Sequence, residues 1–543
     1  MSDQKIKYIV VVGSIMSGLG KGIVTASIGK LLQARGYKVS PIKFDGYLNV
    51  DCGTMNPFRH GEVFVLDDGT EVDMDFGTYE RFLNQSISGE NSITGGKLFQ
   101  KIIEKERRGD YLGRDVQFVP HLTDEIKKWV RNVGKKNDSD VVIVEVGGTV
   151  GDLENSYFLE AMRQLGVEET VLFAQLTFLP SLSEGEQKTK PTQHATRLLQ
   201  SMGINPDIIL CRGNEKLSDE ARKKLALYCN VKEEFVFDDP TLNTIYELPL
   251  LLEKQNLYKA IAEKLKLEDR KPDLKEWKEK VDRIINPKNS AIKIAVVGKY
   301  TSVKDAYISV KEALVHSAAE IDYGLEIEWV EASDLEKMEK EKVTKFLGKF
   351  DGIIVPGGFG ERGIEGKIIA INYARLNKIP YLGLCLGLQL MVIEFARNVC
   401  KLQTAHSTEF DKVTKYPVID FLPEQKQIAK MGASMRLGAY SCDITNNTIT
   451  KQAYDKKECS ERHRHRYEVN PDFVDEISKF GLVFAGFHKS SKGDVTEIVE
   501  WPSEYGFGVA TQAHIELKSR LETPAPIFVQ YMKAAAKRKK EGK

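Results

Sequence analysis

Several features that would place this chain in a specialised class of protein are missing from its 543 residues. The seven cysteines include no Cys-x-x-Cys pair, which argues against a zinc site. Their odd, scattered set is typical of a reducing compartment. No apolar run approaches the length that crosses a membrane, and the run at 9–12 is too short for the core of a signal peptide. We therefore expect a cytoplasmic protein with no membrane partner.

Net charge is missing as well, because 78 Lys and Arg residues balance 78 Asp and Glu residues. A protein that binds nucleic acid through its overall charge carries a basic excess, so we expect no nucleic-acid partner. The remaining composition, 42% hydrophobic and 29% charged, is that of an ordinary globular protein. The chain is too long for one ordinary core, which predicts two domains.

The stretch at 13–36 is the first with a specific chemistry. An apolar run at 8–12 predicts a buried strand before it, and a helix with an apolar face follows its glycines. Strand, glycine-rich loop and helix together cradle phosphate groups, and Lys21 would reach the outer phosphates. The spacing departs from G-x-x-x-x-G-K-[S/T], because the first glycine is Gly13 and Gly22 follows the lysine. The pattern favours a nucleotide site, and a merely tight strand-to-helix turn is the alternative.

Two sets of acids are candidate ligands of magnesium. Asp73 and Asp75 alternate with apolar residues, which predicts a strand that carries both carboxylates on one face. A polar edge that faces solvent is the alternative. Glu145 ends a buried strand at 141–144 and precedes a Gly-Gly turn, where an acid orders magnesium in nucleotide sites. A simple loop cap is the alternative there.

Two further segments carry cations where predicted strands end or helices begin. A second strand at 37–43 completes a βαβ unit and places Lys43 at the edge of a parallel sheet where ligands bind. The segment 188–194 puts two lysines and a glutamine beside a proline that opens a helix, which suits a second phosphate group. A charged helix N-terminus without a ligand is the alternative.

A charged stretch bracketed by prolines separates the two halves of the chain. We predict a first domain at 1–265, a linker at 266–290 and a second α/β domain at 291–543. In the second domain Cys385 follows a predicted strand at 381–384 and lies between Gly383 and Gly387. This is the pattern of a nucleophile elbow with cysteine in place of serine, and the helix that follows stabilises a thiolate. A small buried core residue is the alternative.

A thiol nucleophile needs a base, and His514 is the best candidate among the nine histidines. A terminal strand predicted at 510–515 would point residues i and i+2 the same way, so that Glu516 orients the imidazole. An alternative base lies at 461–470, with His463 and His465, but we interpret this cationic run as a carboxylate clamp or an ion-pair cluster. The turn at 356–358 would present backbone N–H groups as an oxyanion hole.

The order of these motifs resembles that of the CTP synthase family along essentially the whole chain. The motifs are the Gly-rich lysine loop, VEVGGTVGD, KTKPTQH, VPGGFG, GLCLG and RHRHRYEVN. The resemblance implies an α/β protein with two doubly wound parallel-sheet domains. The first is a P-loop, dethiobiotin-synthetase-like amidoligase, and the second is a class I glutamine amidotransferase with a flavodoxin-like fold.

The resemblance also implies a ligase activity, the ATP-dependent amination of UTP to CTP in pyrimidine biosynthesis. ATP phosphorylates uracil O4, and ammonia from glutamine hydrolysis travels through a channel and displaces the phosphate. Magnesium is the implied metal ion, CTP the feedback inhibitor and GTP the allosteric activator. Homotetramers that stack into filaments are implied as the assembly.

The family's motifs assign roles to matching residues. For ATP these are Gly18, Leu19, Gly20, Lys21, Gly22, Ile23, Lys43 and Asp75. For UTP and inhibitory CTP they are Ser17, Asp152, Leu153, Glu154, Lys188, Thr189, Lys190, Pro191, Thr192, Gln193 and Lys224. For glutamine they are Gly358, Leu386, Gly387, Leu388, Gln389, Glu409 and Arg466. Cys385, His514 and Glu516 match the triad, Asp75 and Glu145 the magnesium ligands, Arg362 the GTP-responsive position and Pro240, Thr241 and Leu242 the adenine segment.

The segment around the predicted base departs from the family's pattern. The family has Gln-Phe-His-Pro-Glu there, whereas this chain has Ala513 and Ile515 at the aromatic and proline positions. Two other functions therefore stay open: an ammonia-dependent amidoligase with an impaired glutaminase, and a protein that acts mainly by assembling into filaments. The intact Lys21, Asp75, Glu145 and Cys385 argue against the second.

Overall fold

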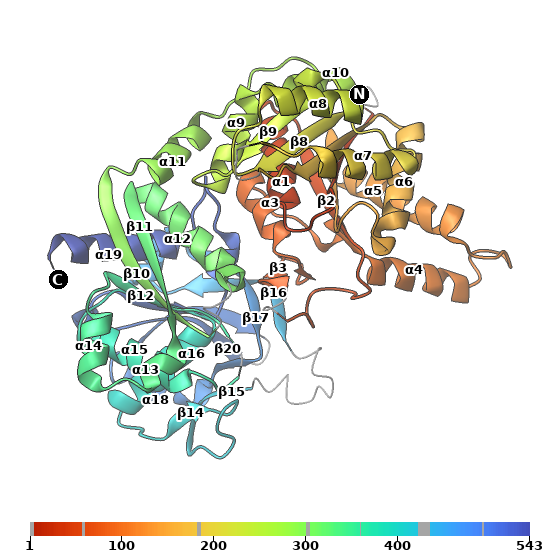
Figure 1. The fold of residues 1–543 in the computed structure, drawn as a ribbon. Helices are drawn as coiled ribbons and strands as arrows, with labels where there is room; N and C mark the ends of the chain where they lie inside the picture. Colours follow the sequence, from red (N-terminus) through yellow and green to blue (C-terminus); the bar gives the residue numbers. More distant parts are fainter. Residues whose placement is uncertain are drawn as a thin grey trace. The chain divides into compact units, whose positions relative to one another are not determined.

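The computed structural model describes residues 5–56, 60–181, 186–299, 304–358, 360–421, 435–490 and 493–542. The chain forms two compact units, each with its own sheet and helices (Figure 1). The first unit comprises Met1–Cys52 and Thr78–Val281, and the second comprises Gly53–Gly77 and Asp282–Lys543. The segment Gly53–Gly77 therefore packs with the second unit although it interrupts the first, which the sequence did not indicate.

The first unit is built on a seven-stranded parallel sheet in the order β5-β2-β6-β1-β7-β8-β9. Its strands are β1 (Lys7–Val12), β2 (Val39–Asp45), β5 (Ser92–Thr94), β6 (Val141–Val146), β7 (Val171–Phe178), β8 (Ile208–Gly213) and β9 (Val236–Pro240). Its helices are α1 (Lys21–Gln33), α4 (Gly95–Arg107), α5 (Thr123–Lys136), α6 (Ser156–Glu168), α7 (Lys190–Ser201), α8 (Asp219–Cys229), α9 (Leu248–Lys254) and α10 (Leu257–Leu265). The chain passes between the units three times: after Cys52, within α3 (Asp75–Leu83) and within α11 (Lys275–Ile285).

Both faces of this sheet are covered, which is why β1 and β6 are almost wholly apolar. One core joins the sheet to α4, α5 and α6, and another joins it to α1, α9 and α10. The chain leaves β1 toward β2 on one side and later reaches β7 on the other, so the order reverses at β1. Ligands of open α/β sheets bind beside such a reversal, at the carboxyl ends of the strands.

The second unit has a nine-stranded sheet in the order β11-β10-β12-β13-β21-β20-β19-β16-β17, which is parallel from β11 to β21 and antiparallel beyond. Its strands are β10 (Asn289–Gly298), β11 (Tyr323–Glu331), β12 (Gly352–Val355), β13 (Tyr381–Leu384), β16 (Arg436–Ile444), β17 (Glu458–His465), β19 (Val483–Ser490), β20 (Gly493–Glu500) and β21 (Gly508–Thr511). A smaller sheet contains β14 (Ala405–Ser407), β15 (Tyr416–Phe421) and β18 (Tyr467–Val469), and a hairpin contains β3 (Phe64–Val65) and β4 (Glu71–Val72).

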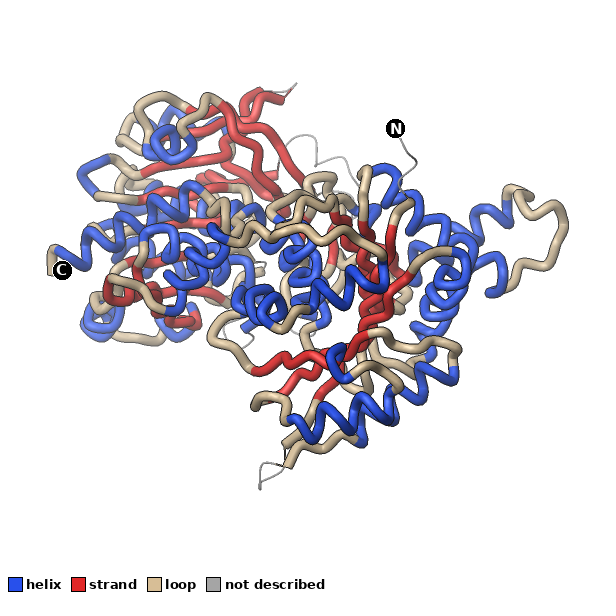
Figure 2. Tube along the Cα trace, turned by 90° about the horizontal axis from the view of Figure 1, so that it is seen from above, coloured by secondary structure: helices blue, strands red, loops and turns tan. Residues whose placement is uncertain are grey.

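Helices cover both faces of the large sheet as well, and Figure 2 shows the strands running between helices. One core joins the sheet to α13 (Ala332–Glu336), α14 (Lys340–Leu347), α15 (Ile364–Leu376) and α16 (Leu386–Asn398). The other joins it to α12 (Ile308–Ile321) and α19 (Pro526–Lys540). The short helices are α17 (Ile449–Tyr454) and α18 (Val474–Ser478). The predicted doubly wound parallel-sheet architecture is confirmed, and the antiparallel extension from β20 to β17 adds to it.

Two local predictions are wrong. Asp73 and Asp75 do not share a strand, because β4 ends at Val72 and α3 begins at Asp75. A carboxylate oxygen of Asp73 accepts the backbone N–H of Asp75 at 2.9 Å, which turns the chain into the helix. The predicted strand at 510–515 ends at Thr511.

Strand β21 ends early because the residues that follow it bond to other strands. The N–H of Gln512 is donated to the carbonyl of Glu497, and the N–H of His514 to that of Arg462. These bonds bend the chain into a short 3-10 helix, Ile515–Lys518.

In the described part of the chain, no helix combines the length and the apolar character needed to span a bilayer.

Candidate active site

The thiol of Cys385 is presented by a tight turn between β13 and α16. Cys385 has φ 53° and ψ −102°, a strained conformation for a residue with a side chain. Its backbone N–H is donated to the carbonyl of Thr511 at 2.7 Å. A Cβ atom on Gly387 would lie 2.1 Å from the carbonyl oxygen of Val355, and one on Gly383 would lie 2.7 Å from the Tyr381 hydroxyl. The predicted strand–elbow–helix geometry is therefore present, and the glycines permit its close packing.

Replacing Gly387 by alanine is expected to lower the free energy of unfolding by about 1–3 kcal/mol, as overpacking does elsewhere. The new methyl group would meet backbone, which cannot move aside as a side-chain tip can. Chemical denaturation measures the loss. Gly166→Ala in α6 is the control, because the atoms that its Cβ would approach belong to side chains, the Phe173 ring at 3.3 Å and Val171 at 3.9 Å. Equal stability of the two variants would contradict the packing argument.

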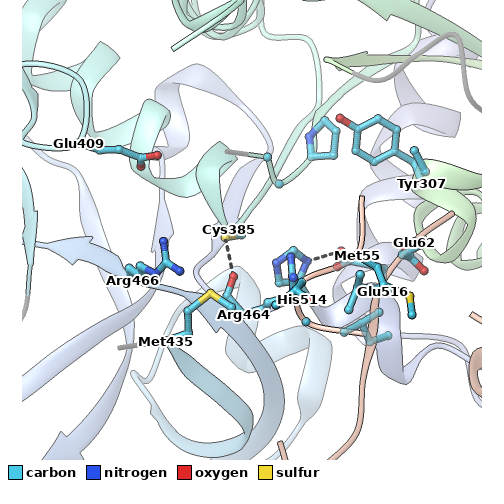
Figure 3. A pocket seen from close by; sticks show the side chains of 18 residues that line it. Met55, Glu62, Tyr307, Cys385, Glu409, Met435, Arg464, Arg466, His514 and Glu516 are labelled. Carbon is cyan, nitrogen blue, oxygen red and sulfur yellow. Dashed lines mark hydrogen bonds and ion pairs between the residues drawn. The ribbon is translucent and has the colours of Figure 1, made fainter. Parts of the chain in front are cut away.

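A histidine and a carboxylate accompany the thiol (Figure 3). Nδ1 of His514 bonds to Oε1 of Glu516 at 2.7 Å, and Glu516 is buried. Burial lowers the pKa of His514, but the charges of Glu516 and of a Cys385 thiolate more than offset it, so this pKa is raised well above its usual value. The predicted pairing thus exists, through a turn rather than along a strand.

The turn at 356–358 lies against the thiol and the imidazole. A Cβ atom on Gly357 would be 2.8 Å from Cε1 of His514 and 3.6 Å from Cβ of Cys385. Gln512, which sequence reasoning did not assign, donates its side-chain amide to the Cys385 sulfur at 3.7 Å. In the sequence, only its position two residues before His514 could have indicated that Gln512 belongs to the site. The turn that was predicted to supply an oxyanion hole therefore lies next to the thiol, together with a side-chain amide donor.

A cavity of about 400 Å³ opens onto the thiol, and a smaller hollow adjoins it. The hollow is lined by predicted glutamine-binding residues: Gly358, Leu386, Gln389, Glu409 and Arg466. Burial raises the pKa of Glu409. Gly387 and Leu388 differ from the rest of the predicted set, because Leu388 is fully buried in the core and Gly387 packs under β12.

The opposite wall of the cavity comes from the segment Gly53–Gly77. Met55, Glu62 and Val63 line it together with Tyr307 from the second half of the chain. Sequence reasoning missed these residues, because nothing in a turn-rich stretch 300 residues away indicates such a contact. Arg362 lies elsewhere, where it donates to the carbonyl of Lys299 and approaches Glu331 at 3.6 Å.

The cationic run at 461–470, interpreted as a carboxylate clamp or an ion-pair cluster, does form ion pairs, of Arg462 with Asp67 and of Arg464 with Glu71. His463 and His465 are buried, their ring nitrogens lie 2.9 Å apart, and burial lowers the pKa of both well below the usual value. Arg436 beside them bonds to Glu468 at 3.0 Å and to Glu497 at 2.8 Å.

In the first unit, the loop after β1 lies beside the turn after β6. Gly18 and Gly20 have φ of 73° and 90°, and α1 begins at Lys21. The ammonium of Lys21 is donated to the carbonyl of Gly148 at 2.7 Å. A Cβ atom on Gly13 would lie 2.9 Å from that same oxygen, so this position also needs a glycine. The lysine therefore lies at the carboxyl ends of the strands, where phosphates bind.

Glu145 lies on β6 at the same edge of the sheet. It is buried, accepts the Tyr79 hydroxyl, and lies 3.7 Å from the ammonium of Lys43, which in turn is 3.9 Å from Asp45. The described residues contain no group of three or more His, Cys, Asp and Glu side chains that could hold a metal ion. A magnesium ion does not need one, because it takes one or two carboxylates together with substrate phosphates. The donor set fits magnesium on those terms.

Buried hydroxyl groups connect the loop after β1 with the start of α7. Thr177 on β7 donates to Ser14 at 3.2 Å and lies 2.9 Å from the hydroxyl of Thr192. The predicted phosphate segment, with Lys188, Thr189, Lys190, Pro191 and Gln193, is thereby held near that loop.

The other predicted nucleotide contacts lie on the surface. Ser17 is exposed, and Leu153 and Glu154 form an exposed turn after Asp152, whose carboxylate accepts the Thr149 N–H at 2.7 Å. Lys224 on α8 pairs with Glu220 at 2.6 Å. In the predicted adenine segment, Pro240 ends β9 and its carbonyl accepts from Arg212 at 3.3 Å.

Comparison with known proteins extends over almost the whole chain. The family model described as CTP synthase N-terminus matches residues 7–267, and that of glutamine amidotransferase class-I matches residues 302–534. The CTP synthase of Methanocaldococcus jannaschii is 50% identical over 539 residues, covering 97% of this chain and 98% of that protein. The CTP synthase of Pyrococcus furiosus is 51% identical, covering 98% and 99%.

A solved structure, the glutaminase domain of Trypanosoma brucei CTPS with bound acivicin, is 38% identical. It covers 46% of this chain and 94% of that one, with a TM-score of 0.43.

Proposed function

The chain belongs to the CTP synthase family, and from that premise we propose that its second unit hydrolyses glutamine at Cys385 while its first unit binds ATP and UTP. The overall activity is the glutamine-dependent amination of UTP to CTP with ATP. The observation that carries the assignment of the thiol is its strained elbow beside the His514–Glu516 pair. An electrophilic glutamine analogue, followed by peptide mapping, tests it: the label should be found on Cys385.

In the proposed glutaminase reaction, Glu409 and Arg466 bind the amino and carboxylate groups of glutamine. His514 takes the thiol proton of Cys385, and the thiolate adds to the side-chain amide carbon. N–H groups of the turn at 356–358 stabilise the oxyanion, each worth roughly 3 kcal/mol of barrier. The imidazolium then protonates the leaving ammonia. Water hydrolyses the thioester to glutamate and restores the thiol.

Glu516→Gln is expected to reduce glutamine hydrolysis by about 10²-fold, the scale of general acid–base catalysis. Without the carboxylate, burial dominates and the pKa of His514 falls, so the imidazolium–thiolate pair becomes less populated. The rate of Cys385 alkylation against pH measures this, and its profile should shift to higher pH. Glu522→Gln, a change outside the site, is the control. An unshifted profile for Glu516→Gln would refute the role of the carboxylate.

In the first unit, the loop at 18–23 and Lys43 bind the phosphates of ATP, and Ser17, Lys188–Gln193 and Lys224 bind UTP. Glu145 would hold magnesium, which neutralises phosphate charge when bound. Transfer of the terminal phosphate of ATP to uracil O4 makes that oxygen a leaving group. Ammonia then adds at the ring carbon, and phosphate departs to give CTP. Lys21 balances charge on the transferred phosphate.

Regulation and assembly stay predictions. We place inhibitory CTP at the UTP residues together with Asp152, Leu153 and Glu154, and the response to GTP at Arg362. The homotetramer and its filaments rest on the family resemblance.

Of the two alternative functions, the ammonia-dependent amidoligase with an impaired glutaminase makes a claim about particular residues, Ala513 and Ile515. Ala513 and Ile515 are buried in the core and the His514–Glu516 bond is formed at 2.7 Å, which supports a working glutaminase.

A further inference from the structure

Within the second unit, the hairpin β3–β4 packs against strands β16 and β17. The carbonyl of Asp67 accepts the backbone N–H of Ala439 on β16 at 2.9 Å. Gly438 has φ 93°, and a Cβ atom there would lie 2.7 Å from the backbone nitrogen of Gly69 at the hairpin turn. The hairpin thus adds to the sheet through close backbone contacts.

Two arginine–carboxylate pairs strengthen this contact. Nε of Arg462 lies 2.7 Å from Oδ1 of Asp67, and Nε of Arg464 lies 2.7 Å from Oε1 of Glu71. The side chain of Arg462 is 0% exposed and that of Glu71 is 9% exposed. Lys518 also approaches Asp67, at 3.3 Å. A buried arginine that loses its carboxylate is strongly disfavoured, so Asp67 holds the side chain of Arg462 firmly. In the second pair it is the carboxylate of Glu71 that is buried, and Arg464 balances its charge.

The backbones of the same two arginines contact the proposed catalytic residues. The carbonyl of Arg462 accepts the backbone N–H of His514 at 2.7 Å. The carbonyl of Arg464 accepts the thiol of Cys385 at 3.9 Å, a contact drawn in Figure 3. Both residues lie on β17, an edge strand of the nine-stranded sheet, and an edge strand has backbone groups that no further strand of that sheet uses.

We propose that Arg462 and Arg464 are positioning residues, which couple the hairpin β3–β4 to His514 and Cys385. The carboxylates of Asp67 and Glu71 hold the arginine side chains, and the arginine carbonyls hold the backbone of His514 and the thiol of Cys385. The hairpin belongs to the sequence matched by the N-terminal family model, so a segment of that half of the chain sets glutaminase geometry. The inference rests on the proposed role of Cys385.

The test is the double variant Asp67→Asn/Glu71→Gln in the full chain. These substitutions keep side-chain shape and remove both charges. We expect kcat for glutamine hydrolysis to fall by about tenfold or more, because small misplacements of reacting groups are costly in rate. KM for glutamine and ammonium-driven CTP formation should change by less than about threefold, since neither depends on where β17 holds His514 and Cys385. Alkylation of the Cys385 thiol should slow with kcat.

The controls separate positioning from general damage. Asp443→Asn removes the exposed pair with Lys489 from the same sheet, 2.6 Å long, and should leave all activities unchanged. Glu71→Asp, which keeps the charge, should recover part of the loss. An unchanged kcat in the double variant, or an equal fall in the ammonium-driven reaction, would overturn the proposal. Loss of hydrolysis in the double variant while Cys385→Ala retains it would instead refute the proposed role of Cys385.

Discussion

Cys385→Ala is expected to lose glutamine-dependent CTP formation by about 10³-fold or more, as when a covalent nucleophile is removed from a triad. Ammonium-driven CTP formation should persist, because the proposed ATP and UTP sites lie in the other unit. The reason is chemical: without the sulfur no thioester forms, and the other groups around the amide have nothing to activate. Parallel assays of CTP with glutamine or with ammonium measure the effect.

A second buried cysteine of the same unit provides the control. Cys400 is 6% exposed, and burial raises the pKa of its thiol to about 11, so it stays protonated and inert. Cys400→Ala should therefore keep both activities. If Cys385→Ala also abolished the ammonium-driven reaction, the division of chemistry between the two units would be wrong.

Lys21→Met is expected to reduce CTP formation by about 10³-fold with either nitrogen source, the scale of a lost charge-stabilising group. The ammonium of Lys21 is held at the strand ends by the carbonyl of Gly148, 2.7 Å away, which is where we propose that the phosphates of ATP bind. Methionine keeps the length of the side chain but cannot balance their charge. Glutamine hydrolysis, assayed as glutamate release, should continue.

Lys30→Met tests whether the effect is specific to the loop. Lys30 lies on the same helix, is also buried, and places its ammonium 4.7 Å from the centre of the Trp277 ring. Its loss should cost some stability and little activity. Equal losses of activity in the two variants would contradict a phosphate-binding role for Lys21.

The elements nearest each site could be predicted because their patterns are local. A buried strand, closely spaced glycines and an amphipathic helix determine the loop before Lys21 and the elbow at Cys385 within about 25 residues each. The pairing of His514 with Glu516 was also predicted, but for the wrong reason. Strand β21 ends early because Arg462 on a distant strand accepts the N–H of His514.

The exchange of Gly53–Gly77 between the units could not be predicted, because it depends on contacts between residues almost 400 positions apart. Asp67 pairs with Arg462 and Glu71 with Arg464, and neither sequence segment indicates the other. Similarly, the predicted strand through Asp73 was wrong because the Asp73 side chain bonds to the backbone of Asp75. Such a bond competes with strand formation, and the alternation of polar and apolar residues does not reveal it.

The central claim is that the Cys385 thiol releases the ammonia that becomes part of CTP. The source of the nitrogen in CTP tests this claim most directly. The enzyme is given UTP, ATP, glutamine labelled with ¹⁵N in its side-chain amide and unlabelled ammonium, and the CTP is analysed by mass spectrometry. We predict ¹⁵N in CTP made by the unmodified protein and only unlabelled CTP from Cys385→Ala. Labelled CTP from Cys385→Ala would contradict the account, because glutamine would then be hydrolysed without the thiol.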